Sequence, residues 1–118
     1  RRGEEFRSGS VRPVLVRLSV SEDANRAVNG CSVAESIVAC YGHAETARAD
    51  GDIVTVDLVD VDHEAPERVA QLVGALIDAD CTKVALHPTF GVLADADRVA
   101  LASAFERARI GADRIVWP

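Results

Sequence analysis

Residues 53–61, Ile-Val-Thr-Val-Asp-Leu-Val-Asp-Val, are the segment that decides the fold. Seven of these nine residues are aliphatic or threonine, which are residue types that favour strands. The following segment, 66–79, begins with a proline and carries apolar residues at helical spacing, so it predicts a helix. A second aliphatic run occupies residues 83–87 and predicts another strand. The order strand, helix, strand is typical of a parallel pair joined by a right-handed crossover.

The same pattern continues towards the amino end. Residues 11–20 alternate between apolar and polar side chains and predict a first strand. Residues 21–30 are polar and rich in turn formers, so we expect a loop there. The segment 32–35, Ser-Val-Ala-Glu, matches a capping box and predicts the start of a helix. We expect this helix either to end near Gly42 or to fray by residue 51.

Towards the carboxyl end, Asp95 predicts the N-cap of a third helix, which Gly111 ends. Residues 114–117 predict a short fourth strand. The fold class is therefore α/β, with the order β-α-β-α-β-α-β and a mostly parallel four-stranded sheet covered by helices. We expect a flexible lead-in or linker over residues 1–10. A single α/β domain, whole or part of a larger protein, is expected over residues 11–118.

Composition narrows the classes of function. The chain has 118 residues, a formal net charge of −6 and a single lysine, which opposes nonspecific binding to nucleic acid. Three cysteines without a C-x-x-C pair indicate free thiols in a reducing compartment, and we expect the cytoplasm. The apolar runs are too short to span a membrane and no signal peptide is visible, so no membrane partner is expected.

Polar side chains gather where the predicted strands end. In a parallel sheet the carboxyl ends of all strands face one edge, and ligands usually bind there. The groups that converge at this edge are Ser19 and Ser21 after the first strand, Asp60, Asp62 and His63 after the second, and His87 and Thr89 after the third. We therefore expect a small-molecule ligand at this edge.

His87 is the candidate catalytic residue, since a histidine acts as base, donor or ligand near neutral pH. The alternative is a structural histidine at a strand end, held by the turn at Pro88. Thr89 is either a donor to an oxyanion or a cap for its loop. Asp57 lies inside an apolar run, so it must be paired, exposed on an edge strand or shifted in pKa. The candidate substrate-binding residues are Pro88, Thr89, Asp57, Asp60 and Ser19.

Metal and cofactor motifs are weak. The run Asp60-x-Asp62-His63 offers oxygen ligands for a hard cation, although a helix cap explains Asp62 equally well. Cys40-x-x-His43 offers two zinc ligands where a tetrahedral site needs four. The chain has no G-x-G-x-x-G, Walker or G-x-S-x-G motif. We expect neither a metal nor a cofactor.

From residue 53 onward the chain resembles the archaeal-type threonyl-tRNA synthetase editing domain, which looks like D-aminoacyl-tRNA deacylase. The shared features are a Val-rich strand with an acidic turn, a helix, and an aliphatic strand that ends at His87-Pro88. A later strand that ends at Pro118 also matches. The resemblance implies hydrolysis of a mischarged aminoacyl ester, with tRNA as partner and with His87 and Pro88 lining the aminoacyl pocket.

A second interpretation is a non-catalytic module that binds a small ligand or completes an assembly. A four-stranded sheet has two open edges that invite pairing, and Trp117 suits an interface. We therefore expect a homo-oligomer or a partner chain. The sequence leaves open whether the protein is an enzyme.

Overall fold

The computed structural model describes residues 13–118, so the lead-in expected over residues 1–10 lies outside the described residues. The elements follow in the order β1 (Pro13–Ser19), α1 (Glu22–Asn29), α2 (Val33–Asp50), β2 (Ile53–Val59), η2 (Val61–His63), α3 (Pro66–Asp78), β3 (Lys83–Leu86), α4 (Asp95–Arg107), η3 (Ala112–Arg114) and β4 (Ile115–Val116). Here η marks a short 3₁₀ helix.

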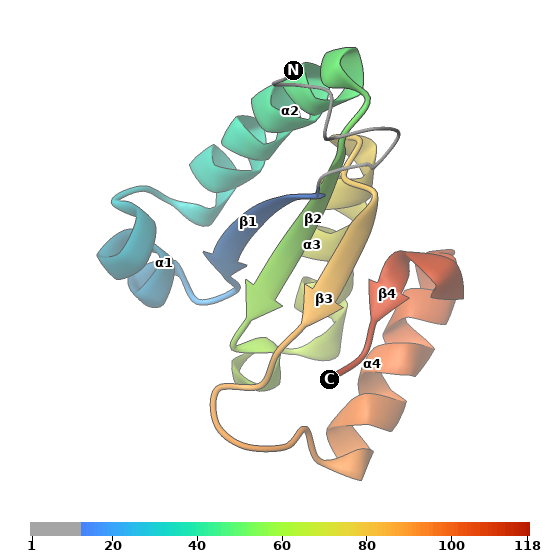
Figure 1. Ribbon diagram of the computed structural model, residues 1–118. Coiled ribbons are helices and arrows are strands. Elements are labelled where there is room, and N and C mark those ends of the chain that lie inside the picture. Colours follow the sequence, from blue (N-terminus) through green and yellow to red (C-terminus); the bar gives the residue numbers. More distant parts are fainter. Residues whose placement is uncertain (1–12) are drawn as a thin grey trace.

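The four strands form one sheet in the order β1-β2-β3-β4, and every neighbouring pair is parallel. The predicted α/β class is therefore confirmed. Each strand lies beside the next strand of the chain, and right-handed crossovers then place the connecting helices on one face. Figure 1 shows α2 and α3 behind the sheet, on its far side.

The core lies between the sheet and these helices. Residues Val54, Val56 and Leu58 of β2 point towards the helices and are at most 1% exposed. The intervening side chains, Thr55 and Asp57, point to the opposite face and are half-buried. Within residues 13–118 no helix covers that opposite face, which we call the open face of the sheet.

Residues 22–29 form helix α1, so the loop expected over residues 21–30 is wrong. The hydroxyl of Ser21 accepts a hydrogen bond from the backbone N–H of Ala24 and caps the helix start. Gly30 ends the helix in the left-handed conformation, with φ 73°. The helix carries few apolar residues, so the apolar periodicity of the sequence did not reveal it.

Helix α2 starts at the predicted capping box but continues through Gly42 to Asp50. A glycine inside a helix costs about 1 kcal/mol, which local packing offsets here. Cys40, Ala44 and Ala47 lie on both sides of Gly42 in sequence and are all buried against the core. Of the two predicted ends, the one near Gly42 is wrong. The helix ends at the other, with Asp50 as its last residue and the left-handed Gly51 as its C-cap.

Smaller differences occur at the other boundaries. Helix α4 starts at Asp95, but Ala94 is its N-cap and no side chain caps it. Asp95 therefore stabilises the first turn by its charge rather than by a cap hydrogen bond. The expected strand over residues 114–117 is shortened to β4, and the expected strand over residues 53–61 ends at Val59.

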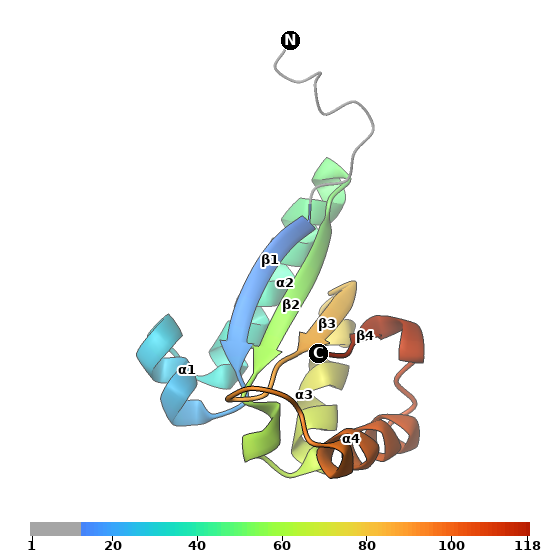
Figure 2. The same ribbon diagram turned by 60° about the horizontal axis from the view of Figure 1, so that its bottom comes forward.

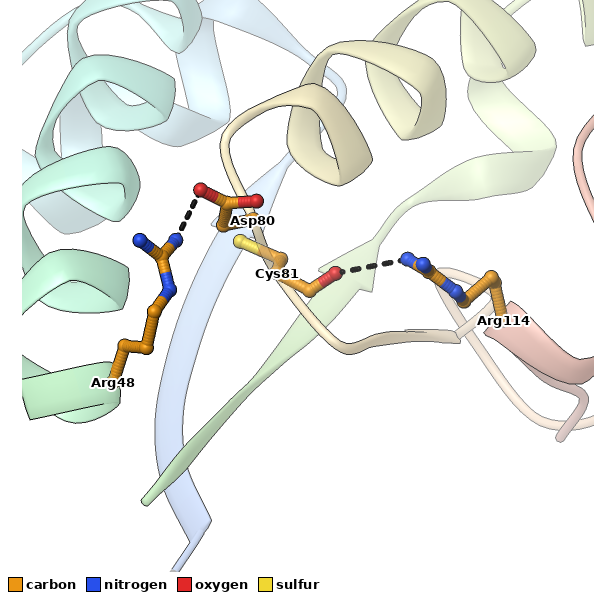
Figure 3. Close-up of polar contacts among 4 residues, drawn as sticks. All are labelled: Arg48, Asp80, Cys81 and Arg114. Carbon is orange, nitrogen blue, oxygen red and sulfur yellow. Dashed lines mark hydrogen bonds and ion pairs between the residues drawn. The ribbon is translucent and has the colours of Figure 1, made fainter. Parts of the chain in front are cut away.

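The loop before β3 contacts α2 through one residue and η3 through the next (Figure 3). Asp80 on this loop forms an ion pair with Arg48 near the end of α2. The next residue, Cys81, accepts a hydrogen bond from Arg114 at 3.4 Å through its carbonyl oxygen. These contacts connect β3 to α2 and to η3.

None of the helices within residues 13–118 combines the length and the apolar character needed to cross a membrane.

Candidate functional site

Asp57 and His87 form a pair on the open face of the sheet. Asp57 lies opposite Ala85 in the register of β2 and β3, and His87 follows Ala85 by two residues, so both side chains point the same way. His87 Nε2 lies 3.1 Å from Asp57 Oδ1. The side chains are 41% and 21% exposed, respectively. Of the three possibilities for Asp57, the structure shows pairing, because β2 is an inner strand rather than an edge strand.

The backbone holds His87 in place just after β3. Its N–H donates to the carbonyl of Leu58 at 3.0 Å, and its own carbonyl accepts from the N–H of Val61 at 3.2 Å. These bonds continue the β2–β3 ladder beyond the last residue of the strand. The imidazole ring is therefore presented at the carboxyl edge, as the sequence predicted, with part of its surface open to solvent.

A cluster of hydroxyls and carboxylates joins three strand ends beside this pair; we call it the edge cluster, and it contains Ser19, Asp60, Asp62 and Thr89. The hydroxyl of Ser19 donates to Asp60, which also accepts from the hydroxyl of Thr89 at 3.1 Å. The backbone N–H of Thr89 donates to Asp62 Oδ1 at 2.9 Å, and its hydroxyl also lies 2.9 Å from Asp62 Oδ1, so the single hydroxyl proton is shared between Asp60 and Asp62. Side chains thus link the end of β1 to the loops after β2 and β3. Figure 2 shows the backbone of these three segments close together at one edge of the sheet.

Two features of the edge cluster show how it is built. Asp60 has φ 64°, a left-handed conformation that L residues seldom adopt outside functional or tightly determined turns. Partial burial raises the pKa of Asp62, but its hydrogen bonds from Thr89 outweigh this effect, so the pKa lies below its ordinary value. The anionic form of Asp62 therefore holds the loop after β3.

Asn25 is a buried support of this edge that the sequence did not reveal. It is 0% exposed, and its side-chain oxygen accepts the backbone N–H of Ser19 at 3.0 Å. Its amide nitrogen donates to the hydroxyl of Ser36 at 2.8 Å and to the carbonyl of Cys31 at 3.0 Å. Asn25 thereby joins α1 and α2 to the end of β1. No sequence signal marks it, since it sits in a polar stretch that resembles a loop.

The remaining sequence candidates stand apart from the pair or serve another role. Pro88 is half-buried between His87 and Thr89, whereas His63 is exposed. Cys40 is buried and its neighbour in the motif, His43, is exposed, so they do not converge on a metal. A hydrogen bond to the thiol of Cys81, together with burial, raises the pKa of Cys40.

Within residues 13–118, no group of three or more His, Cys, Asp or Glu side chains is placed to hold a metal ion. Both carboxylate oxygens of Asp60 accept hydrogen bonds from hydroxyls. A half-buried carboxylate requires such partners, because burial removes part of its contact with water. The oxygen ligands that the Asp60-x-Asp62 spacing offers are therefore used within the protein.

The two largest cavities described lie away from Asp57 and His87. One of ≈ 500 Å³ lies between the ends of α3 and α4, and one of ≈ 350 Å³ lies beside β4. The pair itself faces the uncovered side of the sheet. The pair can exchange a proton with a molecule bound on this face. Neither Asp57 nor His87 lines either of the two cavities.

No protein-family model matches the sequence, and no curated protein matches it. Solved structures do. The hydroxymethylglutaryl-CoA lyase of Pseudomonas aeruginosa superposes with a TM-score of 0.79 over 98% of this chain, at 23% identity. The corresponding lyases of Bacillus subtilis and Brucella melitensis give TM-scores of 0.79 and 0.78, over 97% and 89% of this chain, at 24% and 23% identity.

The chain spans only 39–40% of the length of these structures. The similarity shows the fold alone: four parallel strands with helices on one face, an arrangement shared with the matched part of these structures.

The resemblance to an aminoacyl-tRNA editing domain is wrong, and with it the prediction of an editing hydrolase. The features behind it were an aliphatic strand, a helix and one His-Pro step, which any parallel α/β sheet can contain. Their arrangement in space matches part of the lyase structures instead. Binding of tRNA was expected only from the editing resemblance, so that expectation has no remaining basis.

Proposed function

We propose that this chain supplies part of the catalytic edge of an α/β-barrel lyase, in which His87 is the general base and Asp57 orients it. The observation that carries this proposal is the 3.1 Å contact between His87 Nε2 and Asp57 Oδ1. It lies at the carboxyl edge of a parallel sheet, where barrel enzymes place their catalytic residues.

The contact assigns the two ring nitrogens of His87 to different tasks. A carboxylate accepts hydrogen bonds and cannot donate them, so the Nε2–H of His87 donates to Asp57. Nδ1 then carries the lone pair that takes a proton from a substrate. The side chain is 41% exposed, and the proposal requires Nδ1 to face a molecule on the open face. Asp57 also stabilises the imidazolium that proton transfer creates.

The lyase class comes from the barrel proteins that share the fold, whose names specify hydroxymethylglutaryl-CoA. For a hydroxyacyl thioester, the base would remove the proton of the hydroxyl group. The alkoxide would become a carbonyl as the adjacent carbon–carbon bond breaks, and the bonding pair would pass to the thioester fragment as an enolate. The imidazolium of His87 would return the proton to that carbon.

The edge cluster has a supporting role in this proposal. Ser19 is 3% exposed and its hydroxyl is committed to Asp60, so it holds the loops rather than touching a ligand. Thr89 also uses its hydroxyl on carboxylates. Precise placement of a base needs rigid surroundings, and these bonds hold the loop that follows His87.

The proposal is tested by incubating the protein with hydroxymethylglutaryl-CoA and following its conversion to a smaller acyl-CoA by liquid chromatography and mass spectrometry. His87→Gln keeps a donor for Asp57 but removes the basic nitrogen, so the rate should fall by about 10²-fold or more. His43→Gln is the matched control, because His43 is an exposed histidine on α2. A wild-type protein without turnover, or equal rates for both variants, contradicts the proposal.

A further inference from the structure

Two cations accompany the Asp57–His87 pair on the open face of the sheet. The β1–β2 register places Arg17 directly opposite Asp57. The β2–β3 register places Lys83 opposite Thr55, one pleat before the position opposite Asp57. Alternate residues of a strand share one face, so Arg17 and Lys83 lie on the same face as Asp57. Both cations are exposed.

The charge of this face differs in sign from that of the chain. The whole sequence has a formal net charge of −6, and Lys83 is its only lysine. Among the open-face positions of the four strands, the charged residues are Arg17, Asp57 and Lys83, which are two cations and one anion. Exposed cations that gather on one face of an acidic protein favour an anionic ligand there.

Neither cation is neutralised by a neighbouring acid. Within residues 13–118, neither Arg17 nor Lys83 forms an ion pair or a side-chain hydrogen bond. The carboxylate opposite Arg17 is directed to the imidazole instead, with Asp57 Oδ1 3.1 Å from His87 Nε2. The guanidinium of Arg17 and the ammonium of Lys83 therefore keep their N–H donors for a ligand.

The strand order sets where such a ligand would lie. Figure 1 shows β2 between β1 and β3, so Asp57 stands between Arg17 and His87. With neighbouring strands about 4.8 Å apart and a pleat of about 7 Å, the Cα atoms of Arg17 and His87 are about 12 Å apart. Both side chains are longer than that of Asp57. A molecule of a few carbons that lies over Asp57 can therefore contact both of them.

We propose that Arg17 binds a carboxylate group of the molecule on which His87 acts, with Lys83 as a second cation beside that group. A guanidinium presents paired N–H donors that match the two oxygens of a carboxylate. Its charge also offsets the charge of Asp57, which by itself would repel an anion. The ligand is then a small hydroxy acid or hydroxyacyl compound with a free carboxylate. The inference rests on the proposed function for the role of His87, but the anion site can be tested alone.

The test is a titration of the 118-residue chain with glutarate at pH 7 and low salt, followed by NMR of the His87 imidazole and of the backbone amides of β1–β3. Glutarate carries carboxylates but no hydroxyl group, so it binds without turnover. A saturable shift of these signals is expected. Arg17→Gln should raise the dissociation constant about tenfold or more, since a charge-assisted pair is lost. Arg17→Lys should keep part of the affinity, because it retains the charge without the paired donors.

Matched controls separate this site from general effects of charge. Arg68→Gln removes an exposed arginine from α3, on the covered face, and should leave the dissociation constant unchanged. Glutaramide has the length of glutarate without its charge and should give no saturable shift. Lys83→Gln is an independent variant that should also weaken glutarate binding. Circular dichroism checks that each variant keeps the fold.

Three results would overturn the inference. They are a wild-type titration that does not saturate, equal dissociation constants for Arg17→Gln and Arg68→Gln, and equal binding of glutaramide and glutarate. No bond breaks in these measurements, so they are independent of the proposed lyase reaction. Glutarate binding that depends on Arg17 in a protein without turnover would contradict the lyase reaction alone. Turnover in a protein whose glutarate binding ignores Arg17→Gln would contradict this inference alone.

Discussion

His87 and Asp57 are 30 residues apart in sequence, yet His87 Nε2 and Asp57 Oδ1 lie 3.1 Å apart on neighbouring strands. The contact depends on the parallel register of β2 and β3, which places Ala85 opposite Asp57 and His87 one pleat further on the same face. The order and the register of the strands therefore bring the side chains of His87 and Asp57 into contact.

The first prediction concerns the tautomer of His87. Donation from Nε2–H to Asp57 should hold the neutral ring in the Nε2–H form, which ¹⁵N chemical shifts of the imidazole report directly. In Asp57→Leu the acceptor is gone and the shifts should move towards those of an unrestrained histidine. His43 in the same spectrum provides an internal reference. A His87 ring that is mainly in the Nδ1–H form would contradict the geometry.

The carboxyl edge was predictable in outline. Parallel strands bring their ends together, and Ser19, Asp60 and Thr89 do meet there. The pairing of Asp57 was not predictable, because the sequence does not say which strands are neighbours. With β2 at an edge Asp57 would face water, whereas with β2 beside β3 it faces His87.

Secondary structure was also predictable from the sequence only in part. Helix α3 and strand β2 were predicted because their apolar residues repeat at clear periods and are buried in the core. Helix α1 was missed because its buried residue is Asn25, whose burial is compensated by hydrogen bonds to other elements. Polar networks of this kind have no periodic signature in sequence.

The second prediction concerns acid stability. Hydrogen bonds from Thr89 lower the pKa of Asp62, so the stabilisation by its anion is fully present above the unfolded pKa, about 3.9, and is lost as pH falls through the lower folded value. Asp62→Asn should therefore reduce the free energy of unfolding at pH 6 by less than about 1 kcal/mol, since the site is exposed.

The difference between wild type and Asp62→Asn should shrink on acidification below about pH 4. Urea unfolding at a series of pH values measures it. Glu45→Gln, on the exposed surface in the middle of α2, serves as the control substitution. A difference that grows as the pH falls would have the wrong sign and would exclude the anion of Asp62 as the hydrogen-bond acceptor.

The third prediction concerns the three cysteines. Cys40 and Cys81 are 0% exposed, and their mutual hydrogen bond together with burial raises the pKa of the Cys40 thiol. Cys31 is partly exposed. Because the thiolate is the reactive form, iodoacetamide should label Cys31 at least about tenfold faster than Cys40 in the native protein. Mass spectrometry of peptides counts the labels, and unfolding in urea should make all three react. Equal native rates would show that the region between α2 and β3 opens readily.

The last prediction tests the covered face of the sheet. Leu58 is 0% exposed near the carboxyl end of β2, two residues before Asp60 of the edge cluster. Leu58→Ala would leave a cavity beneath the sheet and should lower the free energy of unfolding by about 2–5 kcal/mol. The control is Val92→Ala in the loop after β3, where Val92 is 88% exposed and the change should stay within about 0.5 kcal/mol. Chemical denaturation measures both.

Since Leu58 and Asp57 point to opposite faces of β2, a loss of stability in Leu58→Ala should leave the His87 tautomer of the folded fraction unchanged. A small effect of Leu58→Ala would mean that this face of the sheet is not the core.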